Sequence, residues 1–344
     1  MLYKFLIKPI FFLFDPEEVH NKILDFVSKF TFLNPFFKFL YSPASGSVFE
    51  ISGLKFKNKL GLAAGFDKNG IAIQFWESLG FSHIEVGTVT PLPQTGNPKP
   101  RIFRLKKDNA LINRLGFNNK GAEEINKNIL ESKKYISKDF IVGVNIGKNK
   151  DTPIKDAFKD YKICFEKLYD AADYFTINIS SPNTEGLRIL HEEIYLDRLL
   201  SEIQKLNEDI SKLKSSSLKC IFLKIAPDLN NEMIETVYKL ARKNKITGLI
   251  ATNTTVQRPK LKTIITEQGG LSGKPLKSMS DKVLKKFNDQ NKKNPDNPLT
   301  IIAVGGVFNK KDFDDKIKFG ASIVQIYTGF IYEGPGIIKN LLKN

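Results

Sequence analysis

Eight short apolar runs, separated by helix-length amphipathic stretches, constrain the fold of this chain more than any other feature. Strands that alternate with helices form parallel sheets, because a parallel connection leaves room for a crossover helix. Runs that are apolar along their length are typical of strands covered on both faces. Eight of them predict an α/β fold of the (β/α)8 TIM-barrel type. The runs span residues 60–66, 83–89, 140–146, 174–179, 220–226, 248–252, 301–304 and 322–327.

The N-terminal residues follow a different pattern. Residues 2–14 are rich in Leu, Ile and Phe but shorter than the roughly 20 apolar residues of a membrane span. Asp15 as N-cap and Pro16 at the first helical position predict that a helix begins there. No small-residue cleavage site intervenes, which argues against a secretory signal peptide.

The predicted helix carries one apolar stripe, and a second apolar cluster follows at residues 36–41. Two interpretations remain open: the helices pack on the main domain, or they rest on a membrane with lysines meeting anionic lipid. The Ser-Pro-Ala-Ser-Gly-Ser stretch at 42–47 predicts a linker, dividing the chain into an N-terminal segment, 1–41, and a barrel, 42–344. The stripe consists of Val19, Ile23, Val27 and Phe30, widened by Leu24 and Phe26.

The formal net charge of +16 favours anionic partners, but the basic residues are scattered along the whole chain. We therefore expect a solvated, lysine-rich surface and no nucleic-acid partner. Cys164 and Cys220 lie far apart and form neither a zinc motif nor a disulfide framework, so a reducing cytoplasm is expected.

The ends of the apolar runs are rich in functional groups, and catalytic residues of barrels lie at the C-terminal ends of the strands. One polar strand end is uninformative, because turns need Asn, Gly or Ser. Eight together predict a lined cavity. Glycines 305, 306 and 329 suit a phosphate, and Lys68 and Lys224 suit a carboxylate and a developing ring anion. Four asparagines suit a flat heterocycle rich in C=O and N–H groups: Asn145, Asn178, Asn183 and Asn253.

These strand ends carry no paired carboxylates and no histidine cluster, which argues against glycosidase and metal-hydrolase chemistry. No metal site is expected.

Motifs along nearly the whole chain resemble dihydroorotate dehydrogenase, in its membrane-associated, quinone-dependent class 2 branch. The soluble enzymes of this family have Cys where this chain has Ser181, which favours class 2. The motifs are LGLAAGFDK (60–68), EVGTVTP (85–91), KPRIFRL (99–105), NRLGFNN (113–119), NIGKNK (145–150), NISSPNT (178–184), IATNTT (250–255) and GGLSGKPL (269–276).

The resemblance implies a flavin mononucleotide (FMN) barrel, one FMN per subunit, that oxidises (S)-dihydroorotate to orotate in de novo pyrimidine (UMP) biosynthesis. It implies that FMN is held by Ala64, Gly65, Lys68, Thr88, Asn145, Asn178, Lys224, Thr252, Gly273, Gly306, Tyr327 and Thr328. It implies that the substrate is surrounded by Lys68, Asn113, Arg114, Leu115, Gly116, Phe117, Asn178, Asn183, Asn253 and Thr254.

The resemblance also assigns roles. Ser181 takes the C5 proton while hydride leaves C6, and Lys224 stabilises the reduced ring. Serine is a poor base at neutral pH, so we expect it to pass its proton onward through Thr184 and a water beside Phe117.

A bilayer quinone, ubiquinone or menaquinone, is the implied electron acceptor. By resemblance His20, Arg104 and Tyr327 line the inner end of an apolar tunnel, which the N-terminal helices open to the membrane. A monomer held peripherally on the cytoplasmic face of the inner membrane is expected.

Two other functions fit the sequence less well. A soluble FMN barrel using fumarate or NAD is disfavoured by Ser181, by the apolar N-terminus and by the lack of an iron–sulfur cysteine pattern. A non-enzymatic basic barrel leaves the eight polar strand ends unexplained.

Overall fold

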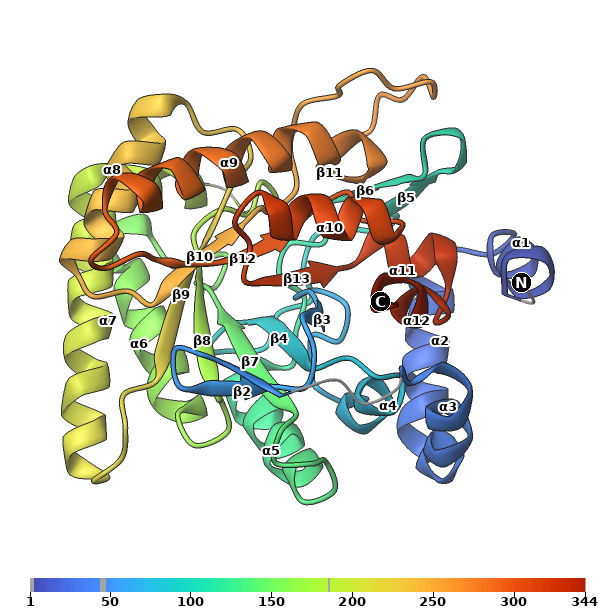
Figure 1. The fold of residues 1–344 in the computed structure, drawn as a ribbon, viewed down its shortest axis with the longest axis horizontal. Coiled ribbons are helices and arrows are strands. Elements are labelled where there is room, and N and C mark those ends of the chain that lie inside the picture. Colours follow the sequence, from blue (N-terminus) through green and yellow to red (C-terminus); the bar gives the residue numbers. More distant parts are fainter. Residues whose placement is uncertain (1–2, 44–47, 185, 344) are drawn as a thin grey trace.

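Eight parallel strands close into a barrel surrounded by helices in the computed structural model, which describes residues 3–43, 48–184 and 186–343 (Figure 1). Each strand falls on one of the eight apolar runs, so the predicted barrel is confirmed. The order around the barrel is β3, β4, β7, β8, β9, β10, β12 and β13, and β13 pairs with β3 to close it. The strands are β3 (Leu60–Leu62), β4 (His83–Val89), β7 (Ile141–Ile146), β8 (Tyr174–Asn178), β9 (Cys220–Ile225), β10 (Gly248–Ala251), β12 (Thr300–Val304) and β13 (Ile323–Ile326).

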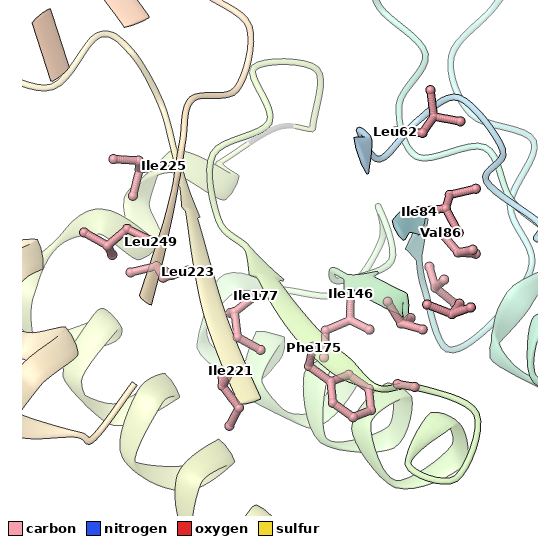
Figure 2. Packing of buried hydrophobic residues seen from close by; sticks show 14 of the residues in the cluster. Leu62, Ile84, Val86, Ile146, Phe175, Ile177, Ile221, Leu223, Ile225 and Leu249 are labelled. Atoms are coloured by element: carbon pink, nitrogen blue, oxygen red, sulfur yellow. The ribbon is translucent and has the colours of Figure 1, made fainter. Parts of the chain in front are cut away.

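The hydrophobic core lies between the barrel and its helices. Outward-facing side chains of the strands, such as Val86, Ile177 and Leu223, are fully buried there (Figure 2). Burial on this face explains why the runs are rich in Ile, Val and Leu. The surrounding helices are α4 (Ile73–Ser78), α5 (Gly121–Lys133), α6 (Ala157–Leu168), α7 (Glu193–Leu213), α8 (Asn231–Lys243), α9 (Lys277–Lys293), α10 (Lys310–Lys318), α11 (Thr328–Glu333) and α12 (Ile337–Leu341).

The inside of the barrel is partly polar, so the inward faces of the runs are less apolar than their outward faces. Glu85 on β4 is hydrogen-bonded to Thr176 on β8, Lys224 on β9 and Gln325 on β13. Because these strands are not neighbours of β4, the contacts must cross the barrel interior. Successive side chains of a strand face opposite sides, so one run presents an apolar and a polar face.

Small β elements close the two ends of the barrel. The hairpin of β1 (Phe49–Ile51) and β2 (Leu54–Phe56) places buried Phe56 against inward residues near the starts of the strands. At the opposite end, β5 (Ile102–Leu105), β6 (Ala110–Asn113) and β11 (Gly270–Gly273) form a three-stranded antiparallel sheet.

The N-terminal residues form helices at one side of the barrel, next to α11 and α12 (Figure 1). The Asp15 side chain accepts hydrogen bonds from the backbone N–H of Glu17, at 2.9 Å, and Glu18, at 3.0 Å, which confirms the predicted helix start. The elements are the π-helix η1 (Tyr3–Ile7), α1 (Lys8–Phe11), α2 (Pro16–Lys29), the 3-10 turn η2 (Thr31–Leu33) and α3 (Asn34–Tyr41).

Only part of the predicted stripe is buried. Leu24 and Val27 pack into the core, whereas Phe26 and Phe30 are 49% and 42% exposed. The helices therefore pack on the barrel and still present aromatic side chains outward. Residues 44–47 of the predicted linker lie outside the described residues, so the boundary between 1–41 and 42–344 stays a prediction.

Candidate active site

A polar cavity lies at the C-terminal ends of the barrel strands, where the sequence placed it. It encloses about 990 Å³ of space, open solvent at its mouth included. Of the predicted cofactor residues, all but Asn145 line it, and of the predicted substrate residues, all but Arg114. Ser181 also lines it, but Thr184 does not.

Asn145 acts one layer beneath the cavity. Its amide oxygen accepts hydrogen bonds from Thr88 Oγ1 at 2.6 Å and Asn178 Nδ2 at 3.0 Å, and its Nδ2 donates to Glu85 at 2.8 Å. The network fixes the hydroxyl of Thr88 and the amide of Asn178, two side chains that face the cavity. Asn145 thus orients the lining residues Thr88 and Asn178, and its own contact with the cofactor stays a prediction.

Arg114 turns away from the cavity, contrary to its predicted role. Its guanidinium pairs with Glu267, donates to the Pro100 carbonyl at 2.9 Å and lies 4.7 Å from the Phe103 ring centroid. Asn113, its neighbour, faces the cavity and receives a 3.2 Å hydrogen bond from Asn183. Side chains alternate along extended backbone, so the two residues point in opposite directions.

Ser181 is 5% exposed, and its Oγ accepts a 3.3 Å hydrogen bond from the Asn183 backbone N–H. Phe117, with a left-handed φ of 53°, lines the same cavity. Thr184 Oγ1 is buried and has no hydrogen-bond partner among the described residues. A buried hydroxyl in that state is commonly satisfied by water, so the expected relay through Thr184 remains a prediction.

Glu85 belongs to the site, although no motif assigned it a role. This carboxylate is fully buried beneath the cavity and lies 3.2 Å from the ammonium of Lys224. Burial alone raises the pKa of Glu85, but Lys224 and several hydrogen-bond donors outweigh it, so the pKa lies below its usual value. The sequence does contain a sign of this role, because Glu85 stands inside an otherwise apolar run, and a buried glutamate rarely lacks a partner.

Lys68 lies in a cationic corner of the cavity. It donates a hydrogen bond to Asn118, and removal from water together with nearby Arg101 lowers its pKa to about 7. Arg101 forms a buried two-pronged ion pair with Glu17 of α2, with N–O distances of 2.9 and 2.6 Å. The N-terminal segment is thereby tied to the loop that precedes β5.

A second, largely apolar cavity lies between the N-terminal helices and the barrel, enclosing about 2140 Å³ including its mouth. The three predicted tunnel residues, His20, Arg104 and Tyr327, all line it. Burial lowers the pKa of His20 to about 4, so its imidazole is neutral at pH 7. Arg104 donates to the Phe14 carbonyl at 2.7 Å and lies 4.6 Å from the Phe12 ring centroid.

Tyr327 lines both cavities, which makes it the wall between them. Its hydroxyl lies 3.4 Å from the Gly65 carbonyl, and its ring centroid is 5.0 Å from that of Phe66.

Comparison with known proteins agrees with this geometry. The family model described as dihydroorotate dehydrogenase matches residues 48–344. The chain belongs to the dihydroorotate dehydrogenase family.

Relatives of the family align over nearly the whole chain. A dihydroorotate dehydrogenase (quinone) of Christiangramia forsetii is 46% identical over 345 residues, covering 99% of this chain and 97% of the relative. One from Shewanella loihica is 45% identical, covering 99% and 98%. The DHODH of Eimeria tenella in complex with ferulenol superposes with a TM-score of 0.85 at 36% identity, covering 95% of this chain and 89% of the other.

The polar cavity fits the FMN on which enzymes of this family depend. Gly305 and Gly306 both have positive φ, 120° and 74°, and leave bare backbone in the lining beside Gly329. Bare backbone of this kind after the last two strands is a common phosphate site of barrels. Lys224, Asn178 and Thr88 supply a cation, an amide and a hydroxyl for a flavin ring.

In the part of the chain that the structure describes, no helix is long and apolar enough to cross a membrane. Across residues 3–43, 48–184 and 186–343, no group of three or more His, Cys, Asp or Glu side chains is placed to hold a metal ion.

Proposed function

We propose that this protein oxidises dihydroorotate to orotate with bound FMN and passes the electrons to a membrane quinone. The observation that carries the proposal is the pair of adjoining cavities that share Tyr327, one polar and one apolar. A water-soluble acid and a lipid-soluble acceptor need separate entrances of these two kinds. The relatives named dihydroorotate dehydrogenase (quinone) support the same reaction.

In the polar cavity the protonated Lys68 holds the substrate carboxylate, and the amides of Asn113, Asn183 and Asn253 fix the ring. Ser181 Oγ accepts the C5 proton. Bound FMN would supply the acceptor for the hydride that leaves C6. The two transfers together leave the C5–C6 double bond of orotate.

The unpartnered Thr184 hydroxyl supports an exit for that proton through a water, because Ser181 must lose its own proton as it gains one. Phe117 shields this corner from bulk water, since its ring is 8% exposed.

In the apolar cavity the neutral His20, Arg104 and the Tyr327 hydroxyl provide polar groups for a quinone carbonyl. The N-terminal helices around it expose a set of large apolar side chains that we propose to rest on the membrane surface, with Lys22, Lys29 and Lys38 near the headgroups. Exposed fractions of this set, the membrane face, are Phe5 72%, Leu13 78%, Phe14 59%, Phe32 73%, Phe36 58% and Phe39 82%.

The proposal is tested with tunnel and site variants in separate half reactions. Arg104→Ala is expected to slow reoxidation of the reduced enzyme by a short-chain quinone, with reduction by dihydroorotate unchanged. Ser181→Ala is expected to show the reverse pattern. If both variants slow the same half reaction, the assignment of one cavity to each substrate is wrong.

A further inference from the structure

Glu85 has no contact with the polar cavity, yet five side chains from four other strands converge on it. Oε1 accepts from Asn145 Nδ2 at 2.8 Å and Lys224 Nζ at 3.2 Å. Oε2 accepts from Thr176 Oγ1 at 3.1 Å, Gln325 Nε2 at 3.2 Å and the Tyr174 hydroxyl at 3.3 Å. A carboxylate held by so many donors inside a barrel is rigid and ionised.

The surroundings are shaped around this carboxylate. The Tyr174 ring reaches Glu85 across Gly143, where a Cβ would come within 2.0 Å of the ring. A carboxylate is costly to bury unless it is paired, and replacing such a pair with apolar residues is often neutral for stability. Fold stability therefore does not explain why the barrel carries the ion pair of Glu85 and Lys224 beneath the cavity.

Lys224 is the group that connects Glu85 with the cavity. Its side chain is 6% exposed and lines the cavity floor, and Glu85 is the one acidic partner within 4.0 Å that the described residues give it. The anion lies behind the ammonium and the cavity lies in front of it. A charge so close to a buried cation acts through a low local dielectric.

We propose that Glu85 is a positioning residue that fixes the Lys224 ammonium against the flavin and offsets part of its positive charge, so that the pair sets how readily the flavin is reduced. The inference rests on the proposed FMN site. A fixed cation stabilises the negative charge that a flavin gains on reduction. Glu85 moderates that effect, which keeps the reduced flavin able to pass its electrons to a quinone.

The test is Glu85→Gln in the full-length, FMN-loaded protein, which keeps the side-chain shape and removes the charge. The equilibrium between oxidised and reduced flavin is measured anaerobically against a reference dye. We expect a shift of at least tenfold towards reduced flavin, or about 30 mV for a two-electron couple. Sulfite, which adds to oxidised flavin as an anion, is expected to bind more tightly by a similar factor.

The matched control is Asp173→Asn. It removes a carboxylate that directly precedes β8, at the end of the barrel away from the cavity. Asp173 accepts from the Val142 N–H at 2.7 Å and pairs with Lys133, so its loss perturbs the barrel without facing the cavity. The control is expected to leave both equilibria unchanged. Equal flavin equilibria in Glu85→Gln and in the unsubstituted protein would overturn the inference, as would an equal shift in the control.

A double variant covers the case in which Glu85→Gln does not fold. Removing one partner of a buried pair leaves the other charge uncompensated, whereas removing both leaves no uncompensated charge. Glu85→Gln with Lys224→Met is then expected to fold and to hold flavin that is harder to reduce than in the unsubstituted protein, because the variant loses the cation that lies nearer to the flavin. A double variant whose flavin equilibrium equals that of the unsubstituted protein contradicts the inference.

The flavin content of the unsubstituted protein separates the two levels of the argument. A colourless protein that takes up no added FMN refutes the proposed function itself. If the protein is yellow and Glu85→Gln leaves its flavin equilibrium unchanged, only the role of Glu85 is refuted.

Discussion

The ion pair between Glu17 and Arg101 ties the N-terminal segment to the barrel, and Glu17→Gln tests what that attachment does. Glu17 is 6% exposed and meets Arg101 through two hydrogen bonds, and Lys99 Nζ lies 3.7 Å from its Oε1. Removing one partner of a buried pair costs about 3–5 kcal/mol. Lys99, the third member of this cluster, is exposed to water, so we take the lower end of this energy range.

A loss of about 3 kcal/mol shifts the docking equilibrium of α2 roughly 100-fold, since 1.4 kcal/mol corresponds to a factor of ten. Because α2 forms one wall of the apolar cavity, the quinone half reaction is expected to suffer while reduction by dihydroorotate stays within about twofold. Limited trypsin digestion measures opening of α2 directly, because Lys22 and Lys29 are exposed on it.

Glu18→Gln is the matched control. Glu18 lies on the same turn, but its side chain is 63% exposed and its ion pair with Lys22, at 4.0 Å, is weak, so its removal is expected to leave the digestion of α2 unchanged. The reasoning is refuted if Glu17→Gln leaves digestion and quinone turnover unchanged, or if it slows both half reactions equally.

Three further predictions address the site and the membrane face. In the proposed reaction the cationic form of Lys68 holds the substrate carboxylate. The pKa of Lys68 is about 7, so kcat/KM for dihydroorotate is expected to fall as pH rises above 7, and a flat profile between pH 6 and 8.5 contradicts this. Ser181→Ala is expected to slow flavin reduction about 10²–10⁴-fold in stopped-flow measurements, and a change of less than tenfold excludes Ser181 as the base. Phe39→Glu is expected to weaken sedimentation with anionic lipid vesicles. Leu213→Glu, at the end of α7 and 85% exposed, is expected to leave sedimentation unchanged. An equal loss of sedimentation in both variants would contradict the proposed membrane face.

The architecture was predictable because its signal is the outward face of each strand. Residues such as Ile84 and Val86 must be apolar to pack against helices, and this periodicity survives in the sequence. The inward face obeys no such rule, because a polar residue there needs only a partner on some other strand. Glu85 and Gln325 meet across the barrel from positions 240 residues apart, which no local pattern reveals.

The candidate site was predictable at the strand ends and less so in the loops. Lys68, Ser181 and Asn253 all face one cavity, as their motifs imply. Arg114 shares a motif with Asn113, but the motif does not say which of two alternating side chains turns inward. The motif of Asn145 likewise does not reveal that its side chain hydrogen-bonds Thr88 and Asn178, two residues that line the cavity.

The central claim is that electrons pass from dihydroorotate to a quinone through a flavin between the two cavities. The most direct measurement follows the visible absorption of the purified protein anaerobically while dihydroorotate and then a short-chain quinone are added. The account predicts a yellow protein that dihydroorotate bleaches and quinone restores. A yellow protein that dihydroorotate leaves unbleached, or a bleached one that quinone fails to restore, would contradict it.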